Sequence, residues 1–320
     1  MSNSDNAALT CVYDLAPDAL EDEVHGQRTL RGLARVSGDL WAYGDRVLLV
    51  SQDGLRWTSL ASELNLTESF SVNAVVGDER GVFIFARCRN GLLCYRLAQS
   101  TWKGTRLPSL PTGSPDALAA RIDGAVLVCV NEGRSAQFMR LGDSEETWVK
   151  LQSSLPGVPV HFEMSNSKVG LCALWGIREK DDVAPSAVYR TEDGGTSWSR
   201  IQEMDTMLLG GASDGNGSTL LGGTDGYIAS GTVAGFRECS ERCADEVAAV
   251  TQDSSQQAAV LGSDEDPVNH TILWRSCSSV WKRFAVAGVD RINHAQVIRF
   301  GVILFCTQRS LLLYRVEVPQ

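Results

Sequence analysis

The 320-residue sequence contains no run of 18 apolar residues, so it has no segment long enough to cross a membrane as a helix. Only 9 residues are proline and 21% are charged, which argues against extensive disorder. The first six residues are polar, and no basic-then-apolar secretion signal follows them. The nine cysteines are an odd number and lie mostly among aliphatic or aromatic residues. We therefore expect free buried thiols, a cytoplasmic location and no membrane partner.

The sequence also lacks the motifs of several catalytic and binding sites. Its four histidines are His25, His161, His270 and His294. No Gly-x-Ser-x-Gly motif accompanies them, as a Ser-His-Asp hydrolase of the common type would require. The glycine pairs at 210–211 and 222–223 lack the lysine of a phosphate-binding loop, and Cys239 and Cys243 have no second pair at metal-ligand spacing. We expect no catalytic residue, no cofactor and no metal.

One stretch, Val188 to Ile201, consists of an apolar segment, a polar turn and a second segment that begins with tryptophan. Asp193 can accept hydrogen bonds from backbone N–H groups a few residues further on. Gly194 and Gly195 can adopt positive φ angles at little steric cost. Trp198 can then bury a large ring that carries one polar group. The stretch predicts a β-hairpin whose polar side chains have a structural role.

The turn fits the pattern Ser/Thr-x-Asp-x-Gly-x-Ser/Thr-Trp at Thr191, Asp193, Gly195, Ser197 and Trp198. It therefore resembles the Asp-box, or BNR repeat, of sialidase-like and sortilin-like β-propellers and of photosystem II assembly factors. Two other turns match the pattern in part. One is a residue short and keeps Ser51, Asp53 and Trp57, and the other keeps Asp143, Thr147 and Trp148 but has Glu145 in place of the glycine. The resemblance implies a propeller fold and a structural role for all of these side chains.

Tryptophans recur with a period in the forties. Trp57, Trp102, Trp148 and Trp198 are separated by 45, 46 and 50 residues. A period of this length with several short strands is typical of propeller blades, since one hairpin cannot bury its apolar face alone. Units of about 44 residues predict an all-β, seven-bladed propeller with four-stranded antiparallel blades, forming one domain over residues 8–320.

The two ends of the chain are expected to meet in the last blade. The expected blades span about 31–61, 70–107, 116–152, 160–202, 206–239, 246–286 and 292–318. Tyr13 lies 44 residues before Trp57, on the same period. We therefore expect residues 8–16 to pair with the strand near Leu311–Val318 as the outer strand of the last blade, closing the ring and removing sheet edges. Residues 1–7 are expected to be disordered and residues 17–30 to form an acidic linker. A ring of six or eight blades would leave Tyr13 out of period or need an unseen unit.

The resemblance indicates a member without catalysis. Sialidases carry an arginine cluster, a Tyr–Glu pair and a Phe/Tyr-Arg-Ile-Pro motif, whereas neither Arg121-Ile122 nor Arg291-Ile292 is followed by proline.

The formal net charge is −10, and the window from 203 to 266 contains twelve acids and two bases. Such a surface disfavours nucleic acid and favours capture of a basic protein. A merely solvating surface is the alternative.

Binding residues are expected on the loops between the second and third strands of the blades, because loops on a rigid scaffold concentrate recognition. The charged residues in these loops are Arg87, Arg89, Arg178, Glu179, Lys180, Asp181, Asp182, Asp264, Glu265, Asp266 and Arg309. The sequence predicts a non-enzymatic protein-binding propeller, monomeric outside its complex, and specifically an immunity protein that neutralises a basic, nuclease-like toxin by covering its active site. The alternatives are an assembly or scaffold factor for a larger complex and a degenerate sialidase-like glycan-binding propeller.

Overall fold

The structure is a computed structural model that describes residues 8–14, 28–64, 70–88, 91–98, 101–107, 117–142, 147–176, 178–179, 182–183, 185–239, 242–263, 265–276 and 279–317. Over these residues the chain is all β, built from antiparallel strands and turns. None of the described segments is a helix that could span a membrane. Residues 1–7 and the expected linker up to residue 27 lie outside the described part of the chain.

The strands form four-stranded antiparallel units, which we number as sheets I to VII in chain order. Sheet I contains β2 (Thr29–Val36), β3 (Asp39–Asp45), β4 (Val47–Ser51) and β5 (Thr58–Ser59). Sheet II contains β6 (Phe70–Asp78), β7 (Gly81–Cys88), β8 (Gly91–Ala98) and β9 (Thr101–Arg106). A single residue pair, Asp45 and Ser71, joins sheets I and II. Sheet III contains β10 (Ala117–Ile122), β11 (Ala125–Glu132), β12 (Ser135–Leu141) and β13 (Trp148–Pro156).

The remaining sheets repeat this order of strands. Sheet IV contains β14 (Val158–Met164), β15 (Gly170–Trp175), β18 (Ser186–Thr191) and β19 (Ser199–Met204). Sheet V contains β20 (Leu208–Ser213), β21 (Thr219–Gly223), β22 (Ile228–Thr232) and β23 (Gly235–Glu238). Sheet VI contains β24 (Glu246–Gln252), β25 (Gln256–Gly262), β26 (Asn269–Ser276) and β27 (Lys282–Ala287). Sheet VII contains β28 (Ile292–Arg299), β29 (Val302–Thr307), β30 (Leu311–Glu317) and β1 (Ala8–Asp14).

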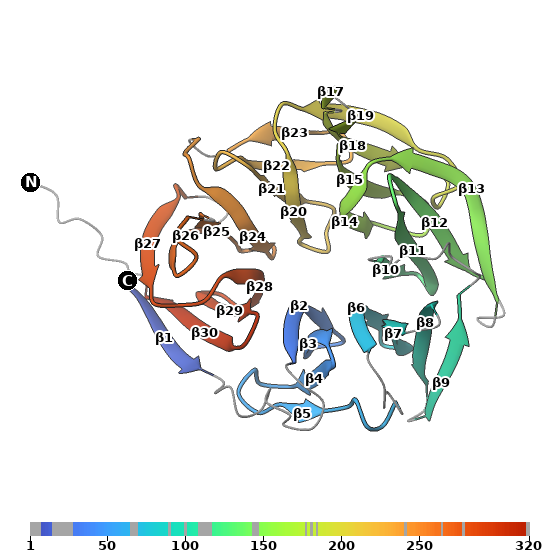
Figure 1. Cartoon of the computed structure of the whole chain (residues 1–320), viewed down its shortest axis with the longest axis horizontal. Helices are drawn as coiled ribbons and strands as arrows, with labels where there is room; N and C mark the ends of the chain where they lie inside the picture. The colour runs from blue at the N-terminus through green and yellow to red at the C-terminus, as the bar shows by residue number, and fades with distance from the viewer. Residues whose placement is uncertain are drawn as a thin grey trace, which may run out of the picture.

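The sheets are arranged around a common centre, with the first strand of each sheet innermost (Figure 1). The innermost strands are β2, β6, β10, β14, β20, β24 and β28. Each of them contacts the innermost strand of the next sheet, and β28 contacts β2. This radial arrangement of antiparallel sheets is that of a β-propeller.

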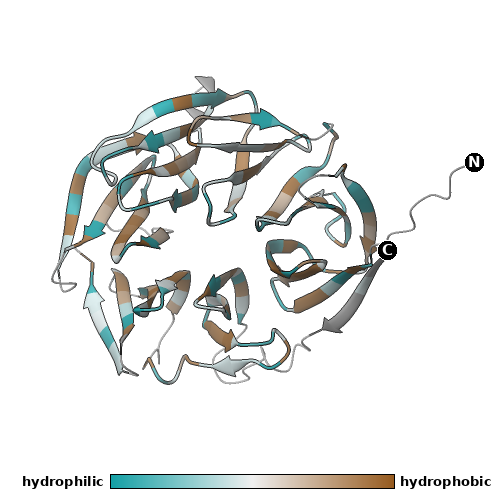
Figure 2. Cartoon of the chain, turned by 180° about the vertical axis from the view of Figure 1, so that it is seen from behind, coloured by the Kyte–Doolittle hydropathy of each residue, from teal (hydrophilic) through white to brown (hydrophobic). Residues whose placement is uncertain are grey.

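The hydrophobic core lies between neighbouring sheets. Figure 2 shows hydrophobic and hydrophilic residues alternating along many strands, as expected for sheets that bury side chains on their faces. Phe85 of sheet II packs edge to face against Trp148 of sheet III, with ring centroids 5.8 Å apart. Leu49 of sheet I and Leu304 of sheet VII belong to one buried cluster. Each sheet therefore depends on its neighbours to bury its apolar faces.

The N-terminal strand β1 pairs with β30, as the position of Tyr13 in the period predicts. The antiparallel register runs from Ala8 opposite Glu317 to Asp14 opposite Leu312, with one irregularity between Cys11 and Tyr13. The pairing covers residues 8–14 of the expected 8–16. The last sheet is thus built from both ends of the described chain.

The structure corrects one expected boundary and adds detail to one expected loop. The expected linker over 17–30 ends too late, because β2 already begins at Thr29. Thr29 and Leu30 pair with Asp45 and Gly44 of β3, and Leu30 is fully buried with its N–H donating to the Gln308 carbonyl at 3.0 Å, so these residues belong to the sheet. The hydrophilic insertion at 178–182 contains a short hairpin of β16 (Arg178–Glu179) and β17 (Asp182–Val183) where a loop was expected.

Candidate functional site

The turn at Thr191–Trp198 is held together by its own side chains. The Thr191 hydroxyl donates to Asp193 Oδ1 at 2.9 Å and accepts from the Gly195 N–H at 2.9 Å. Asp193 also accepts from the Ser197 N–H at 2.8 Å and the Ser197 hydroxyl at 2.6 Å. The Ser197 hydroxyl, helped by backbone N–H groups and Thr191, holds the pKa of Asp193 below its usual value. The Asp193 carboxylate is therefore used as a hydrogen-bond acceptor within the turn.

The same arrangement recurs in sheet I although its sequence match is one residue short. Asp53 Oδ1 accepts from the backbone N–H groups of Leu55 and Arg56 at 2.8 and 2.9 Å and from the Ser51 hydroxyl at 3.1 Å. The indole N–H of Trp57 donates to the Gly54 carbonyl at 3.1 Å, as that of Trp198 does to Gly195 at 3.2 Å.

Of the residues that keep the pattern in the third match, only Thr147 and Trp148 are among the described residues. Trp148 is buried, but its indole N–H has no hydrogen-bond partner among the described residues. Glu145 stands three residues before it, at the place of the glycine whose carbonyl accepts the indole N–H in the other two turns. Residues 143–146, which include Asp143, lie outside the described part of the chain.

The charged residues predicted to bind a partner lie at the connections between second and third strands. Arg87 is near the end of β7, Glu265 and Asp266 lie between β25 and β26, and Arg309 lies between β29 and β30. In an antiparallel sheet this connection is at the end where the innermost strand begins. We call this end of the sheets the entry face. Arg89, Lys180, Asp181 and Asp264 lie outside the described residues, and only the backbone of Arg178, Glu179 and Asp182 is described.

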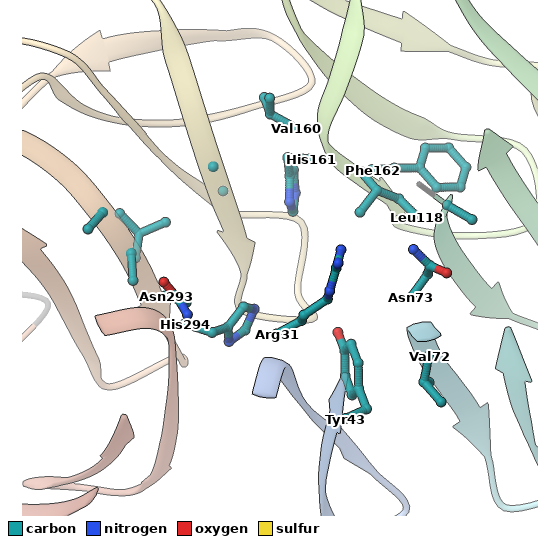
Figure 3. A pocket seen from close by; sticks show the side chains of 16 residues that line it. Arg31, Tyr43, Val72, Asn73, Leu118, Val160, His161, Phe162, Asn293 and His294 are labelled. Carbon is teal, nitrogen blue, oxygen red and sulfur yellow. The ribbon is translucent and has the colours of Figure 1, made fainter. Parts of the chain in front are cut away.

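A cavity of about 350 Å³ lies at the centre of the molecule, and the sequence did not predict it (Figure 3). Its polar lining residues are Arg31, Tyr43, Asn73, His161, Asn293 and His294, and glycine and apolar residues complete the wall. Each innermost strand contributes to the wall. The contributing residues lie in the first half of β2, β6, β10 and β28 and around the middle of β14, β20 and β24, so the cavity lies toward the entry face.

β-Bulges shape the wall of this cavity. Six innermost strands contain one extra residue near their start, where the register with the second strand shifts. The extra residues are Arg31, Asn73, Val160, Leu209, Ala248 and Asn293. All of them except Leu209 line the cavity. A bulge re-aims a side chain relative to the regular pleat, so the strands present these residues to the centre.

Two of the polar side chains in the wall have acidic partners. Arg31, whose side chain is 41% exposed, contacts Asp45 Oδ2 through Nε at 3.1 Å and Nη2 at 3.0 Å. His161 Nε2 lies 3.4 Å from Glu163 Oε2, while Glu163 Oε1 accepts a hydrogen bond from the Thr219 hydroxyl. Both carboxylates are thus engaged by neighbouring residues of the chain.

Burial by itself would raise the pKa of Glu163. Its contact with His161, together with hydroxyl groups of Ser213 and Thr219, outweighs burial and lowers this pKa below its usual value. Burial lowers the pKa of His294 to about 4, so this ring is uncharged at neutral pH. Burial also raises the pKa of Tyr43 well above its usual value, so its hydroxyl stays protonated.

The repeat in the sequence contained a signal for this site. The bulge residues at 31, 73, 160, 209, 248 and 293 are separated by 42, 87, 49, 39 and 45 residues, which is close to one or two periods of the tryptophan repeat. These residues could not be identified from the sequence, because a bulge has no single residue type.

No protein-family model matches this chain, and no curated protein matches it. Solved structures match it over nearly its whole length. A structure of YCF48 bound to D1 peptide is 15% identical, with a TM-score of 0.67, and the match covers 99% of this chain and 98% of that one. YCF48 from Cyanidioschyzon merolae is 12% identical, with a TM-score of 0.65 and coverage of 92% and 98%. A GH74 xyloglucanase from Xanthomonas campestris is 15% identical, with a TM-score of 0.67 and coverage of 97% and 54%. At these identities the likeness establishes the fold alone, which is a β-propeller.

Proposed function

We propose that this chain is a non-catalytic, seven-bladed propeller that binds a segment of a partner protein over its central cavity, as an assembly or scaffold factor of a larger complex. Sheets I to VII are the blades. The pairing of β1 with β30 and the packing of sheet I against sheet VII support a ring closed by the N-terminal strand. A closed ring is a rigid platform, and rigid platforms present loops for recognition.

The position of the cavity carries this proposal. It lies near the entry face, the end of the sheets with the second-to-third connections that contain Glu265, Asp266 and Arg309. A chain segment that crosses this face would contact these connections and could insert a side chain into the cavity. A volume of about 350 Å³ suits one or two side chains or a small molecule.

Among the functions expected from the sequence, the assembly-factor alternative gains support from a propeller of similar length. The YCF48 structure with D1 peptide matches this chain from end to end. This support is an analogy of fold, and fold does not determine function. The immunity-protein alternative gains no such support, and the GH74 xyloglucanase, whose fold likeness is equal, is matched over only 54% of its chain. The exposed acids Glu265 and Asp266 favour a basic segment in the partner at the rim.

We also propose a cytoplasmic location, which the free thiols of the described cysteines support. The free thiols are Cys88, Cys94, Cys129, Cys172, Cys239, Cys243 and Cys306. Four of them are buried, and burial raises the pKa of Cys94 to about 12, which keeps that thiol unreactive. A reducing compartment preserves thiols of this kind.

Site-specific photo-crosslinking in the native organism tests the proposal. A photo-crosslinking residue is placed at position 265 or 309 of the entry face, and at position 285 of the outer strand β27 as a control. We expect one defined protein to crosslink from both entry-face positions and not from position 285. Crosslinking of the same proteins from all three positions, or of none, would contradict binding at this face.

A further inference from the structure

The wall of the central cavity is rich in hydrogen-bond donors. Among the described residues that line it, none is acidic, whereas Arg31, His161 and His294 carry ring or guanidinium nitrogens and Asn73 and Asn293 carry amides. Figure 3 shows these side chains projecting from several different strands toward the same space. Arginine is the group best suited to planar anions because its guanidinium presents five N–H donors in a fixed fork.

The backbone holds the donors in place before any ligand binds. Arg31, Asn73 and Asn293 are the extra residues of bulges in β2, β6 and β28, and each bulge is flanked by paired residues of the same strand. Asp45 contacts the guanidinium of Arg31 at Nε and Nη2, and these contacts fix the orientation of the guanidinium. A site carried by paired strands loses little conformational entropy on binding.

Two acids contact residues of the cavity wall without lining the cavity themselves. Asp45 is directed at Arg31, and Glu163 is held between Thr219 and His161. They offset part of the local positive charge without forming the wall. The net charge of −10 acts at longer range and is screened beyond about 8 Å at physiological salt. Short-range hydrogen bonding therefore decides which ligand the cavity accepts.

We propose that the central cavity binds a carboxylate group through Arg31, with the neighbouring histidine and asparagine side chains completing its hydrogen bonds. The carboxylate belongs either to a free small organic acid or to an acidic residue of the partner segment, and in the second case the inference rests on the proposed function. A carboxylate offers acceptors only, which matches the guanidinium of Arg31 and the N–H groups of the neighbouring amides and imidazoles. Charge-assisted hydrogen bonds of this kind are the strong ones in proteins.

Calorimetric titration with succinate tests the free-acid source, with neutral succinamide of similar shape as the control ligand. We expect saturable binding of succinate with a Kd below about 1 mM and none of succinamide. Arg31→Gln should weaken binding about tenfold or more, since it removes a charge-assisted partner. Arg35→Gln is the matched control, because Arg35 lies on the same strand but donates to the Ile298 carbonyl at 2.8 Å.

A second variant fills the cavity without touching its donors. Gly210 lines the cavity, and a Cβ atom added there meets no atom within 4 Å. Gly210→Leu should therefore fold and abolish succinate binding by occupying the space. The neighbouring Gly211 is unsuitable, since a Cβ there would lie 2.6 Å from His161 Cγ. Ala285→Leu on the exposed face of β27 is the control and should bind as the parent does.

The second source of the carboxylate, an acidic residue of the partner protein, is tested with the segment identified by crosslinking. It is made as a synthetic peptide with its acidic groups intact or converted to amides. Loss of affinity on amidation, and on Arg31→Gln in the propeller, supports the inference. A peptide that binds equally well as the amide, together with no saturable binding of succinate, overturns the inference and leaves the proposed function standing. Succinate binding with the expected variant effects, but without a crosslinked partner, supports the inference and contradicts the proposed function.

Discussion

Trp198 of sheet IV stacks on Phe138 of sheet III, with ring centroids 4.7 Å apart and an angle of 25° between the planes. Across the same boundary, the Ser153 hydroxyl donates to the Gly195 carbonyl at 2.9 Å. The turn at Thr191–Trp198 thus stabilises its own hairpin and also joins two neighbouring sheets.

Replacing Trp198 should weaken the packing between sheets III and IV. Trp198 is half-buried, so we expect Trp198→Ala to lower the free energy of unfolding by about 2–4 kcal/mol, somewhat below the loss for a fully buried aromatic. Urea denaturation followed by circular dichroism measures the change. Trp175→Ala, at a side chain that is 41% exposed, is the control and should cost much less. Equal losses in the two variants would contradict a role at the boundary.

The carboxylate of Asp193 should stabilise the fold in a pH-dependent way. Asp193→Ala should cost about 1–3 kcal/mol near pH 7, since it leaves N–H and hydroxyl donors of the turn without their acceptor. Because the pKa of Asp193 is lowered in the folded state, its contribution is present above the unfolded pKa and is lost as pH falls through the folded pKa. Unfolding measured at pH 7 and pH 3 should show the variant's deficit shrinking at pH 3. Glu192→Ala is the control: it removes an ion pair with Arg190 in which the Glu192 side chain is 68% exposed, and it should cost much less at pH 7.

His294 should make the fold sensitive to mild acid. Its folded pKa of about 4 is below its usual value of about 6.5, so the unfolded chain takes up a proton first as pH falls. The stabilisation is complete above about pH 6.5 and declines toward pH 4. His294→Gln should reduce the slope of unfolding free energy against pH in this window. An imidazole NMR signal of His294 that titrates near pH 6.5 in the folded protein would contradict the expectation.

The hydrogen bonds of the Gln256 side chain should stabilise the contact between sheets VI and VII. Its side chain is fully buried, donates to the Arg299 carbonyl at 2.8 Å, and accepts from the Gly301 N–H at 3.0 Å and the Trp274 indole at 2.8 Å. Gln256→Leu keeps the volume but leaves buried groups unpaired, so we expect a loss of about 2–4 kcal/mol in urea denaturation. Gln308→Leu, at an exposed position, is the control. A Gln256→Leu protein of parental stability would contradict this prediction, since it would mean that water satisfies the groups that Gln256 bonds.

Removal of the N-terminal strand should expose an edge. Deleting residues 1–16 takes away β1 and leaves the backbone groups of β30 unpaired, and unpaired edges promote aggregation. Light scattering during thermal unfolding should show aggregation at a lower temperature than in the full chain. Deletion of residues 1–7 alone retains β1 and should behave as the full chain does. Unchanged melting of the longer deletion would show that β1 contributes little.

The features predicted correctly from the sequence depend on short-range chemistry or on the repeat. Gly194 and Gly195 both have positive φ angles, 71° and 86°, because a tight turn around Asp193 admits few other backbone shapes. The strands follow from alternating apolar residues within a few positions of one another. The pairing of β1 with β30 also follows from the sequence, since Tyr13 keeps the spacing of the later tryptophans.

The sequence by itself thus determined the all-β class, the repeating sheets, the turn chemistry and the partner of the N-terminal strand. Only the tertiary structure decided the central site. Arg31, Asn73, His161 and Asn293 are separated by up to 262 residues and meet because the innermost strands surround one cavity. Their direction is set by bulges, and a bulge is defined by pairing with the next strand, so no local pattern specifies it. Local propensities act over a few residues, whereas this cavity exists only once every sheet has packed against its neighbours.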